Sequence, residues 1–160
     1  MKIAIANDHG GVELKKTIIA HLEAGGHEMV NIGSDSPEIV RYPLYAAEAV
    51  RMLTSGAVDR TILICSTGIG MSIIANKFKS VRAAVCTESY SAKMTRRHND
   101  SNILCLGGKI TGENMILEIC DVWLNEAYEG GRHDISLGII ADAENAMITG
   151  GDWSAARAYP

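Results

Sequence analysis

TILICSTGIGMS, residues 61–72, is the stretch that decides the fold. Its first half is an apolar run of the kind that forms a buried strand, and this run ends at Cys65 before a loop with two glycines. The residues that follow, 71–78, favour a helix. Glycines let backbone amides turn toward one point, and a helix N-terminus adds partial positive charge there. The stretch therefore predicts a strand, a loop that can hold an anion or an oxyanion, and a helix.

The same alternation of strand and helix runs through the rest of the chain. Short runs rich in Ile, Val and Leu predict strands at 2–7, 28–32, 59–65, 82–86 and 102–106. The segments between and after them predict helices at 11–24, 43–54, 71–78, 89–99 and 112–127. We therefore expect an α/β fold, a doubly wound (Rossmann-like) three-layer sandwich with a parallel sheet and right-handed crossovers. Its ligands should sit beyond the carboxyl ends of the strands.

The length of 160 residues suits a single domain. We expect this domain to span residues 1–149, with a C-terminal helical extension at 135–147, and residues 150–160 to form a tail. Asp8 interrupts the first apolar run too early for a secretion signal, and no run approaches the ~20 apolar residues of a membrane span. A cytoplasmic protein without a membrane partner is expected.

Charge and cysteine spacing argue against several other classes. The net charge is −4, and residues 96–98 are the only compact basic cluster, so a nucleic-acid partner is not expected. The four cysteines form no C-x-x-C pair, and the histidines lack the spacing of metal ligands. We therefore expect neither a disulfide framework nor a metal site.

Known phosphate-binding motifs fit the glycine loop poorly. The dinucleotide fingerprint needs a third glycine where Ile73 stands. A P-loop needs Lys and Ser/Thr directly after its last glycine, where Met71 and Ser72 stand. A cysteine phosphatase would need an arginine late in the loop, at the place of Met71. Nucleotide binding and phosphatase chemistry both lose support.

Cys65 is the first candidate for chemistry, and two interpretations stay open. The partial positive charge of a helix N-terminus favours a thiolate, which could act as a base. A cysteine at a strand end can also be a small buried side chain. Cys86 and Cys105 lie inside apolar runs and are expected in the core.

Further candidates stand at other element ends. Asp8 and His9 follow the first strand, where a carboxylate and an imidazole could move protons, although Asp8 could also be only a helix cap. For His98, at the end of a predicted helix, two interpretations also stay open. It could supply a second imidazole to the site, or it could only cap the helix C-terminus. Positive charge for an anion could come from Lys77, Lys109 or Arg132, each of which could instead be a solvated surface residue.

Six motifs in this order resemble those of the ribose-5-phosphate isomerase B family. They are Asp8-His9-Gly10-Gly11, Tyr42-Pro43, Cys65-Ser66-Thr67-Gly68-Ile69-Gly70, Ala75-Asn76-Lys77 with Arg82-Ala83-Ala84, Arg97-His98-Asn99-Asp100 and Gly130-Gly131-Arg132-His133. The resemblance extends from Lys2 to about Glu144. It implies a five-stranded sheet with helices on both faces, and a homodimer or homotetramer with active sites shared between subunits.

The resemblance also implies a reaction, the interconversion of ribose 5-phosphate and ribulose 5-phosphate through an enediolate, without a cofactor or a metal. By matching position, Cys65 would move the proton between C1 and C2. His98 would open the sugar ring, and Asp8 would assist the proton transfers. Thr67, with Gly68 and Gly70, would stabilise the developing oxyanion.

The remaining matched residues would bind the substrate. His9 and Arg132, the latter from the neighbouring chain, would hold the phosphate, and Asn99 would hold the intermediate. The other substrate-binding positions implied are Tyr42, Ser66, Gly68, Ile69, Gly70 and Lys109.

Three departures from the family pattern bear on the substrate. Ser136 and Lys109 stand where members commonly carry arginines, and Arg41 stands where an aspartate is common. Lysine binds phosphate as a point charge without a bidentate fork, and serine removes the charge. The same chemistry on allose 6-phosphate, galactose 6-phosphate or a tetrulose phosphate stays open as an alternative, as does a non-catalytic sugar-phosphate-binding module.

Overall fold

The computed structural model of the chain describes residues 1–150 and residue 153, and the expected tail at 150–160 lies, apart from Gly150 and Trp153, outside the described residues. Two compact units are present, Met1–Tyr128 and Glu129–Pro160. The strands are β1 (Lys2–Asn7), β2 (Glu28–Asn31), β3 (Arg60–Cys65), β4 (Ala83–Val85) and β5 (Ile103–Gly107). The helices are α1 (Val12–Ala24), α2 (Tyr42–Thr54), α3 (Ile69–Ala75), α4 (Ser89–Asn99), α5 (Glu113–Asn125) and α6 (Arg132–Thr149), with a short 3-10 turn, η1 (His9–Gly11).

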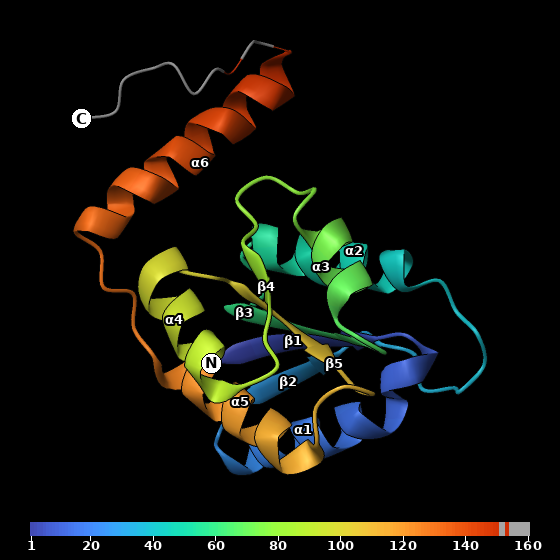
Figure 1. The fold of residues 1–160 in the computed structure, drawn as a ribbon. Coiled ribbons are helices and arrows are strands. Elements are labelled where there is room, and N and C mark those ends of the chain that lie inside the picture. The colour runs from blue at the N-terminus through green and yellow to red at the C-terminus, as the bar shows by residue number, and fades with distance from the viewer. Residues whose placement is uncertain (151–152, 154–160) are drawn as a thin grey trace. The chain divides into compact units, whose positions relative to one another are not determined.

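All five strands pair in parallel, in the order β2-β1-β3-β5-β4 (Figure 1). The chain leaves β1 toward one side of the sheet and leaves β3 toward the other. The point where the direction reverses therefore lies between the carboxyl ends of these two strands, where open α/β sheets bind their ligands. The expected doubly wound α/β fold is confirmed.

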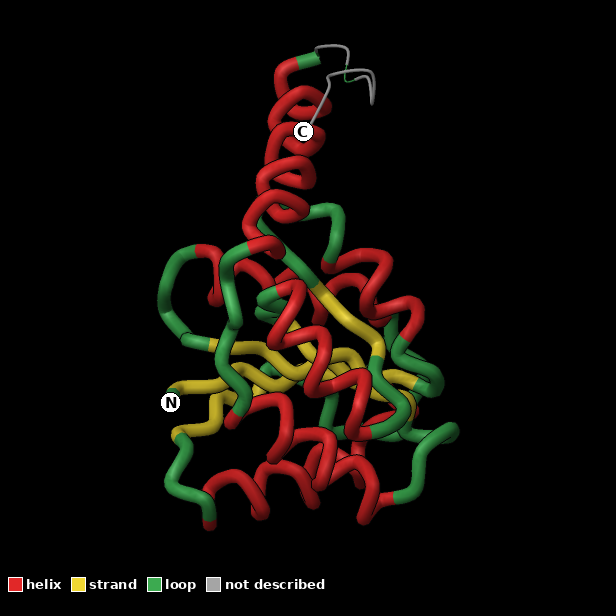
Figure 2. Tube along the Cα trace, turned by 60° about the vertical axis from the view of Figure 1, so that its left-hand side comes forward, coloured by secondary structure: helices red, strands yellow, loops and turns green. Residues whose placement is uncertain are grey.

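Each face of the sheet is covered by helices and encloses its own core (Figure 2). Side chains alternate along each strand, so β1 turns Ile3 and Ile5 toward α1, α4 and α5. It turns Ala4 and Ala6 toward α2 and α3. The two alanines of β1 share their core with Ala46 and Ala49 of α2, and small side chains on both elements allow a close approach of the helix to the sheet.

Several element boundaries differ from those expected. The helix expected at 71–78 begins at Ile69, because Gly68 adopts a left-handed conformation (φ 78°) and caps it. The helix expected at 11–24 is preceded by the separate turn η1, whose cap is Asp8. The strand expected at 82–86 is shorter, 83–85, since β4 is an edge strand that pairs only with β5.

The second unit contains α6, which is longer than the helix expected at 135–147. No side chain of α6 is buried, although apolar residues occur all around it and Ile135, Ile140, Met147 and Ile148 are more than half exposed. Among the described residues, no helix is long and apolar enough to cross a membrane.

The loops at the carboxyl edge of the sheet pack backbone against backbone. Gly107, the last residue of β5, lies directly under Thr67: a β-carbon at Gly107 would come within 2.9 Å of the carbonyl carbon of Thr67. The chain after β5 is tied to the same loop, since the amides of Gly108 and Lys109 donate to the carbonyls of Cys65 and Ser66. The position of the loop after β3 therefore depends on the absence of a side chain at Gly107.

Gly107→Ala should lower the free energy of unfolding by about 1–3 kcal/mol, because neither backbone can move without breaking ladder hydrogen bonds. Gly112→Ala is the matched control, since nothing lies within 4 Å of its β-carbon position and its φ is −67°. Urea unfolding at one protein concentration measures both variants. Equal stability of the two variants would show that the loop can shift away from β5 at little cost.

Candidate active site

Cys65 is the last residue of β3 and faces the core between the sheet and α2 and α3. Its side chain is nearly buried, with 6% of its surface exposed. The amide of Gly68 donates a hydrogen bond of 3.1 Å to Sγ, because the left-handed turn at Gly68 points this N–H back toward the strand. An amide donor at sulfur stabilises negative charge there. The loop after β3 therefore places a hydrogen-bond donor at the Cys65 sulfur.

The loop after Cys65, which we call the cradle loop (residues 66–70), presents amides at the start of α3. The N–H groups of Gly70 and Met71 belong to the first turn of α3, whose amides have no acceptor within the helix. The amide of Ile69 is bound to Oγ1 of Thr67 at 3.3 Å. Of the three predicted oxyanion donors, Gly68 directs its amide to Cys65 Sγ in this structure, which leaves Gly70 as the better placed amide.

Asp8 and His9 meet the cradle loop at the same edge of the sheet. The amide of Asp8 donates to the carbonyl of Ile64, the residue before Cys65. A β-carbon on Gly10 would lie 2.9 Å from Oγ of Ser66 and 3.2 Å from Oδ1 of Asp8, so the two loops are in close contact. The Asp8 carboxylate is 7% exposed and accepts the Gly10 amide at 2.8 Å. Asp8 therefore caps the turn η1, whereas the N-cap of the first helix, α1, is Gly11.

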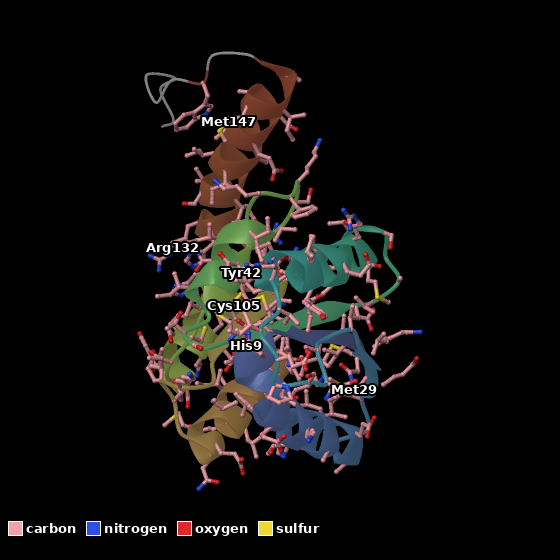
Figure 3. The ribbon with its side chains drawn as sticks, turned by 90° about the vertical axis from the view of Figure 1, so that its right-hand side faces the viewer. His9, Met29, Tyr42, Cys105, Arg132 and Met147 are labelled. Carbon is pink, nitrogen blue, oxygen red and sulfur yellow. The ribbon has the colours of Figure 1, made fainter. Side chains whose placement is uncertain are left out.

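Tyr42 closes the other side of the cradle loop. A β-carbon on Gly70 would lie 2.8 Å from the Tyr42 ring, so the ring lies against the backbone of the loop. A pocket of about 530 Å³ is lined by Asp8 and His9 together with residues 39–44, and Figure 3 shows His9 and Tyr42. Among the residues that the structure describes, Nδ1 of His9 is buried and has no hydrogen-bond partner. A buried nitrogen of this kind costs free energy unless a ligand or water pairs with it.

His98 and Asn99 lie at the amino edge of the sheet, opposite the edge where Cys65 of the same chain lies. The helix α4 starts after the carboxyl end of β4 and runs back for 11 residues, about 16 Å, to the amino end of β5. Nε of Arg82, which precedes β4, donates to the carbonyl of Asn99 at 2.9 Å. The direction of a parallel sheet's crossover helix therefore separates these residues from Cys65.

The other cationic residues near which a phosphate could bind lie in two places, the carboxyl edge of the sheet and the second unit. Lys109 follows β5 at the carboxyl edge, with its side chain exposed and its amide bound to Ser66. Arg41 lines the pocket that contains Asp8 and His9. Arg132 is the first residue of α6 and belongs to the second unit.

Two residues that support the site were not expected from the sequence. The buried Asn7 side chain donates to the carbonyls of Asp8 (2.7 Å) and Ser34 (2.9 Å). Lys15 is also buried and donates to the Ser34 carbonyl at 2.8 Å, and its ion pair lowers the pKa of the Asp35 carboxyl. A polar residue at the end of an apolar strand was the available sign for Asn7. Nothing in the helix pattern distinguishes Lys15 from a surface lysine.

Cys86, Cys105 and Cys120 differ from Cys65 in their surroundings. Burial raises the pKa of the Cys86 thiol to about 11 and of the Cys120 thiol to about 12, and it raises that of Cys105 strongly. Near neutral pH these three thiols are therefore protonated and inert as bases. The prediction that Cys86 and Cys105 belong to the core is confirmed.

Similar proteins carry the same architecture. The chain is 48% identical over 132 residues to ribose-5-phosphate isomerase B of Escherichia coli, a match that covers 82% of this chain and 89% of that protein. The solved structure of Clostridium thermocellum ribose-5-phosphate isomerase B has a TM-score of 0.90 and 45% identity, covering 92% of this chain and 99% of the other.

A third similar structure contains a ligand. It is ribose-5-phosphate isomerase B of Mycoplasma genitalium with bound ribulose 5-phosphate, with a TM-score of 0.87 and 34% identity over 90% of this chain and 96% of the other. The family model described as ribose/galactose isomerase matches residues 3–140. With the fold, the cysteine at the end of β3 and these matches together, the chain belongs to the ribose/galactose isomerase family.

Proposed function

We propose that this protein is an aldose–ketose isomerase that interconverts ribose 5-phosphate and ribulose 5-phosphate. The observation that carries the proposal is Cys65, held at the carboxyl end of β3 by the Gly68 amide and placed beside Asp8 at the ligand-binding edge. The proposed isomerase domain is residues 1–149, since the family match crosses both units and α6 ends at Thr149. Four free cysteines agree with a reducing cytoplasm as the proposed location.

The proposed chemistry is a proton transfer between neighbouring carbons. The Cys65 thiolate removes the proton from C2 of the open-chain aldose, which forms an enediolate, and returns it to C1. Thr67 and the amides at the start of α3 stabilise the charge that develops on the substrate oxygen. Asp8 carries the proton between the two oxygens, and no redox partner is needed because the oxidation at C2 balances the reduction at C1.

Substrate binding in this proposal uses the pocket beside the cradle loop. The unpaired Nδ1 of His9 gives the phosphate a donor, and Tyr42, Ser66 and Ile69 border the sugar. Arg41 supplies positive charge in the same pocket, which compensates for Ser136 at a position where the family commonly has arginine. Lys109 adds a second cation at this edge of the sheet.

The active site requires a second copy of the chain. His98 and Asn99 lie about one helix length from Cys65 within a chain, so a ring-opening histidine must come from a neighbouring subunit. The exposed apolar side chains of α6 are of the kind that a partner subunit covers. We therefore propose a homodimer or homotetramer in which the partner supplies its own copies of His98, Asn99 and Arg132.

Cys65→Ser should lower kcat for ribose 5-phosphate by about two to four orders of magnitude, because the hydroxyl is a far weaker base than the thiolate. Substrate affinity and unfolding should change little. Cys86→Ser is the matched control, and it should keep turnover while losing some stability. The assay follows isomerisation of four-, five- and six-carbon sugar phosphates. Near-normal turnover of Cys65→Ser would refute the cysteine base.

The same assay separates the alternatives for the whole protein. Turnover of a six-carbon or four-carbon substrate in preference to ribose 5-phosphate would assign the chemistry to another sugar phosphate. Binding of these compounds without any turnover by the wild type would favour the non-catalytic binding module.

Mixing two inactive variants tests the shared site. If each site combines Cys65 of one chain with His98 of the other, Cys65→Ser mixed with His98→Gln regains activity, because one of the two sites in each heterodimer is intact. Random exchange should restore about a quarter of the wild-type rate. A mixture of Cys65→Ser with Cys65→Ala should stay inactive. Verified subunit exchange without recovery would place a complete site within one chain.

Arg41→Gln should raise KM for ribose 5-phosphate by roughly tenfold with little change in kcat, as expected for a group that binds the phosphate equally in substrate and transition state. Arg51→Gln, on the helix that begins after Arg41 and outside the pocket, removes the same charge and should leave both constants unchanged. An unchanged KM in Arg41→Gln would exclude Arg41 from phosphate binding.

A further inference from the structure

A second pocket opens at the amino edge of the sheet, opposite the cradle loop. It has a volume of about 590 Å³, within the range of small-molecule sites. Its walls come from the chain segments that precede β3, β4 and β5. We call it the Arg60 pocket, and its polar lining consists mainly of Arg60, Lys79, Ser80, Arg82, Asp100 and Asn102.

The pocket lining carries three cations, Arg60, Lys79 and Arg82, and two carboxylates, Asp59 and Asp100, so positive charge exceeds negative charge by one. Asp100 is already shared, since Oδ2 accepts Arg82 and Oδ1 accepts Arg96, both at 2.8 Å. Within the described part of the chain, Arg60 and Lys79 form no ion pair. The Arg60 guanidinium donates a hydrogen bond of 2.9 Å to the backbone carbonyl of Asp59.

The surroundings of Arg60 make this excess of positive charge unfavourable in free energy. Its pKa is lowered, first by partial burial and then by the nearby Arg96 cation. A half-buried guanidinium beside a second one is stabilised by any anion that approaches both. A phosphate group suits this pocket because Arg60 offers a planar fork and Lys79 offers a point charge, while Arg82, whose Nε and Nη2 are bonded to Asn99 and Asp100, adds its positive charge.

The backbone around the pocket is also unusual. Ser80 (φ 62°) and Asp100 (φ 45°) are the two non-glycine residues with positive φ in the described structure, and both line it. The Asn102 side chain holds the turn at Ser80: its Nδ2 donates to the Ser80 carbonyl at 2.8 Å, and its Oδ1 accepts the Arg82 amide at 2.8 Å. Strained backbone of this kind occurs preferentially where a structure binds or switches.

We propose that the Arg60 pocket is a second anion site, which binds a phosphate group through Arg60, Lys79 and Arg82. Its lining is separate from Cys65, Asp8 and His9, so it does not belong to the proposed catalytic site. The phosphate can be inorganic or part of a small metabolite, whose apolar portion would meet Leu53 and Val58.

Titration with pyrophosphate, followed by the amide resonances of the intact protein at low ionic strength, tests the site. Saturable shifts are expected at Ser80 and Asn102, and at Asp100, because Arg82 donates to the Asp100 carbonyl. The double variant Arg60→Gln/Lys79→Gln should bind at least tenfold more weakly here and keep any shifts of the cradle loop. Lys16→Gln/Arg51→Gln removes the same charge from exposed ion pairs and should titrate like the wild type.

Two results would overturn the proposal: no shift at Ser80 and Asn102 up to about 10 mM pyrophosphate, where a Kd of about 1 mM would be saturated, or equal titrations in both double variants. Lys79→Glu alone, at an exposed loop position, gives the same test if Arg60→Gln impairs folding. Repeating the titration with inorganic phosphate and glycerol 3-phosphate separates the two sources. Tighter binding of the ester assigns the site to a phosphorylated metabolite, and equal binding assigns it to phosphate itself.

Discussion

The parallel pairing of β1 with β3 is the constraint on which the rest of the site depends. The register places Asn7 opposite Ile64, so that the two strands end side by side and Asp8 and Cys65 emerge at one edge. The amide of Asp8 completes the ladder by donating to the Ile64 carbonyl. Because the chain leaves these strands in opposite directions, no helix covers the space beyond them. The Asp8 carboxylate, the Cys65 thiol and the cradle loop therefore meet at this edge as a consequence of the strand pairing.

Small residues then set how closely the loops approach. Gly10, Gly68 and Gly107 lie where a β-carbon would meet neighbouring backbone or the hydroxyl of Ser66. The cradle loop is therefore rigid, because it is packed between the backbone of β5 and the Tyr42 ring. Buried Asn7 and Lys15 satisfy the carbonyls of the adjoining loop, whose unpaired burial would cost free energy. Rigidity at this edge is what an enzyme needs to hold donors in place before charge develops.

The parallel direction of the strands brings Asp8 and Cys65 together at the carboxyl edge of the sheet. It also separates them from His98, another predicted catalytic residue. A crossover helix must return the chain to the amino edge, so the last turn of α4 carries His98 and Asn99 away from Cys65. Arg82, Asp100 and Arg96 hold that turn, with Trp123 under the Arg96 guanidinium at 5.9 Å and bonded to Ser101. This separation of His98 from Cys65 within one chain is the physical basis of the oligomer proposed above.

Local pattern determined much of this protein. Apolar runs of strand length, helices between them and the glycines after Cys65 were sufficient for the fold class and the five strands, because each depends on neighbours in the chain. Candidate residues such as Tyr42 and Asn99 came from the resemblance to a known family. The observed helix boundaries differ from the expected ones where the conformation of a single residue decides them, as at Gly68. Only the tertiary structure decided the strand order, the separation of His98 from Cys65, the burial of Lys15 and the meeting of Arg60 with Arg82. These features depend on which segments distant in sequence pack together, and the periodicity of apolar residues along the chain does not determine that packing.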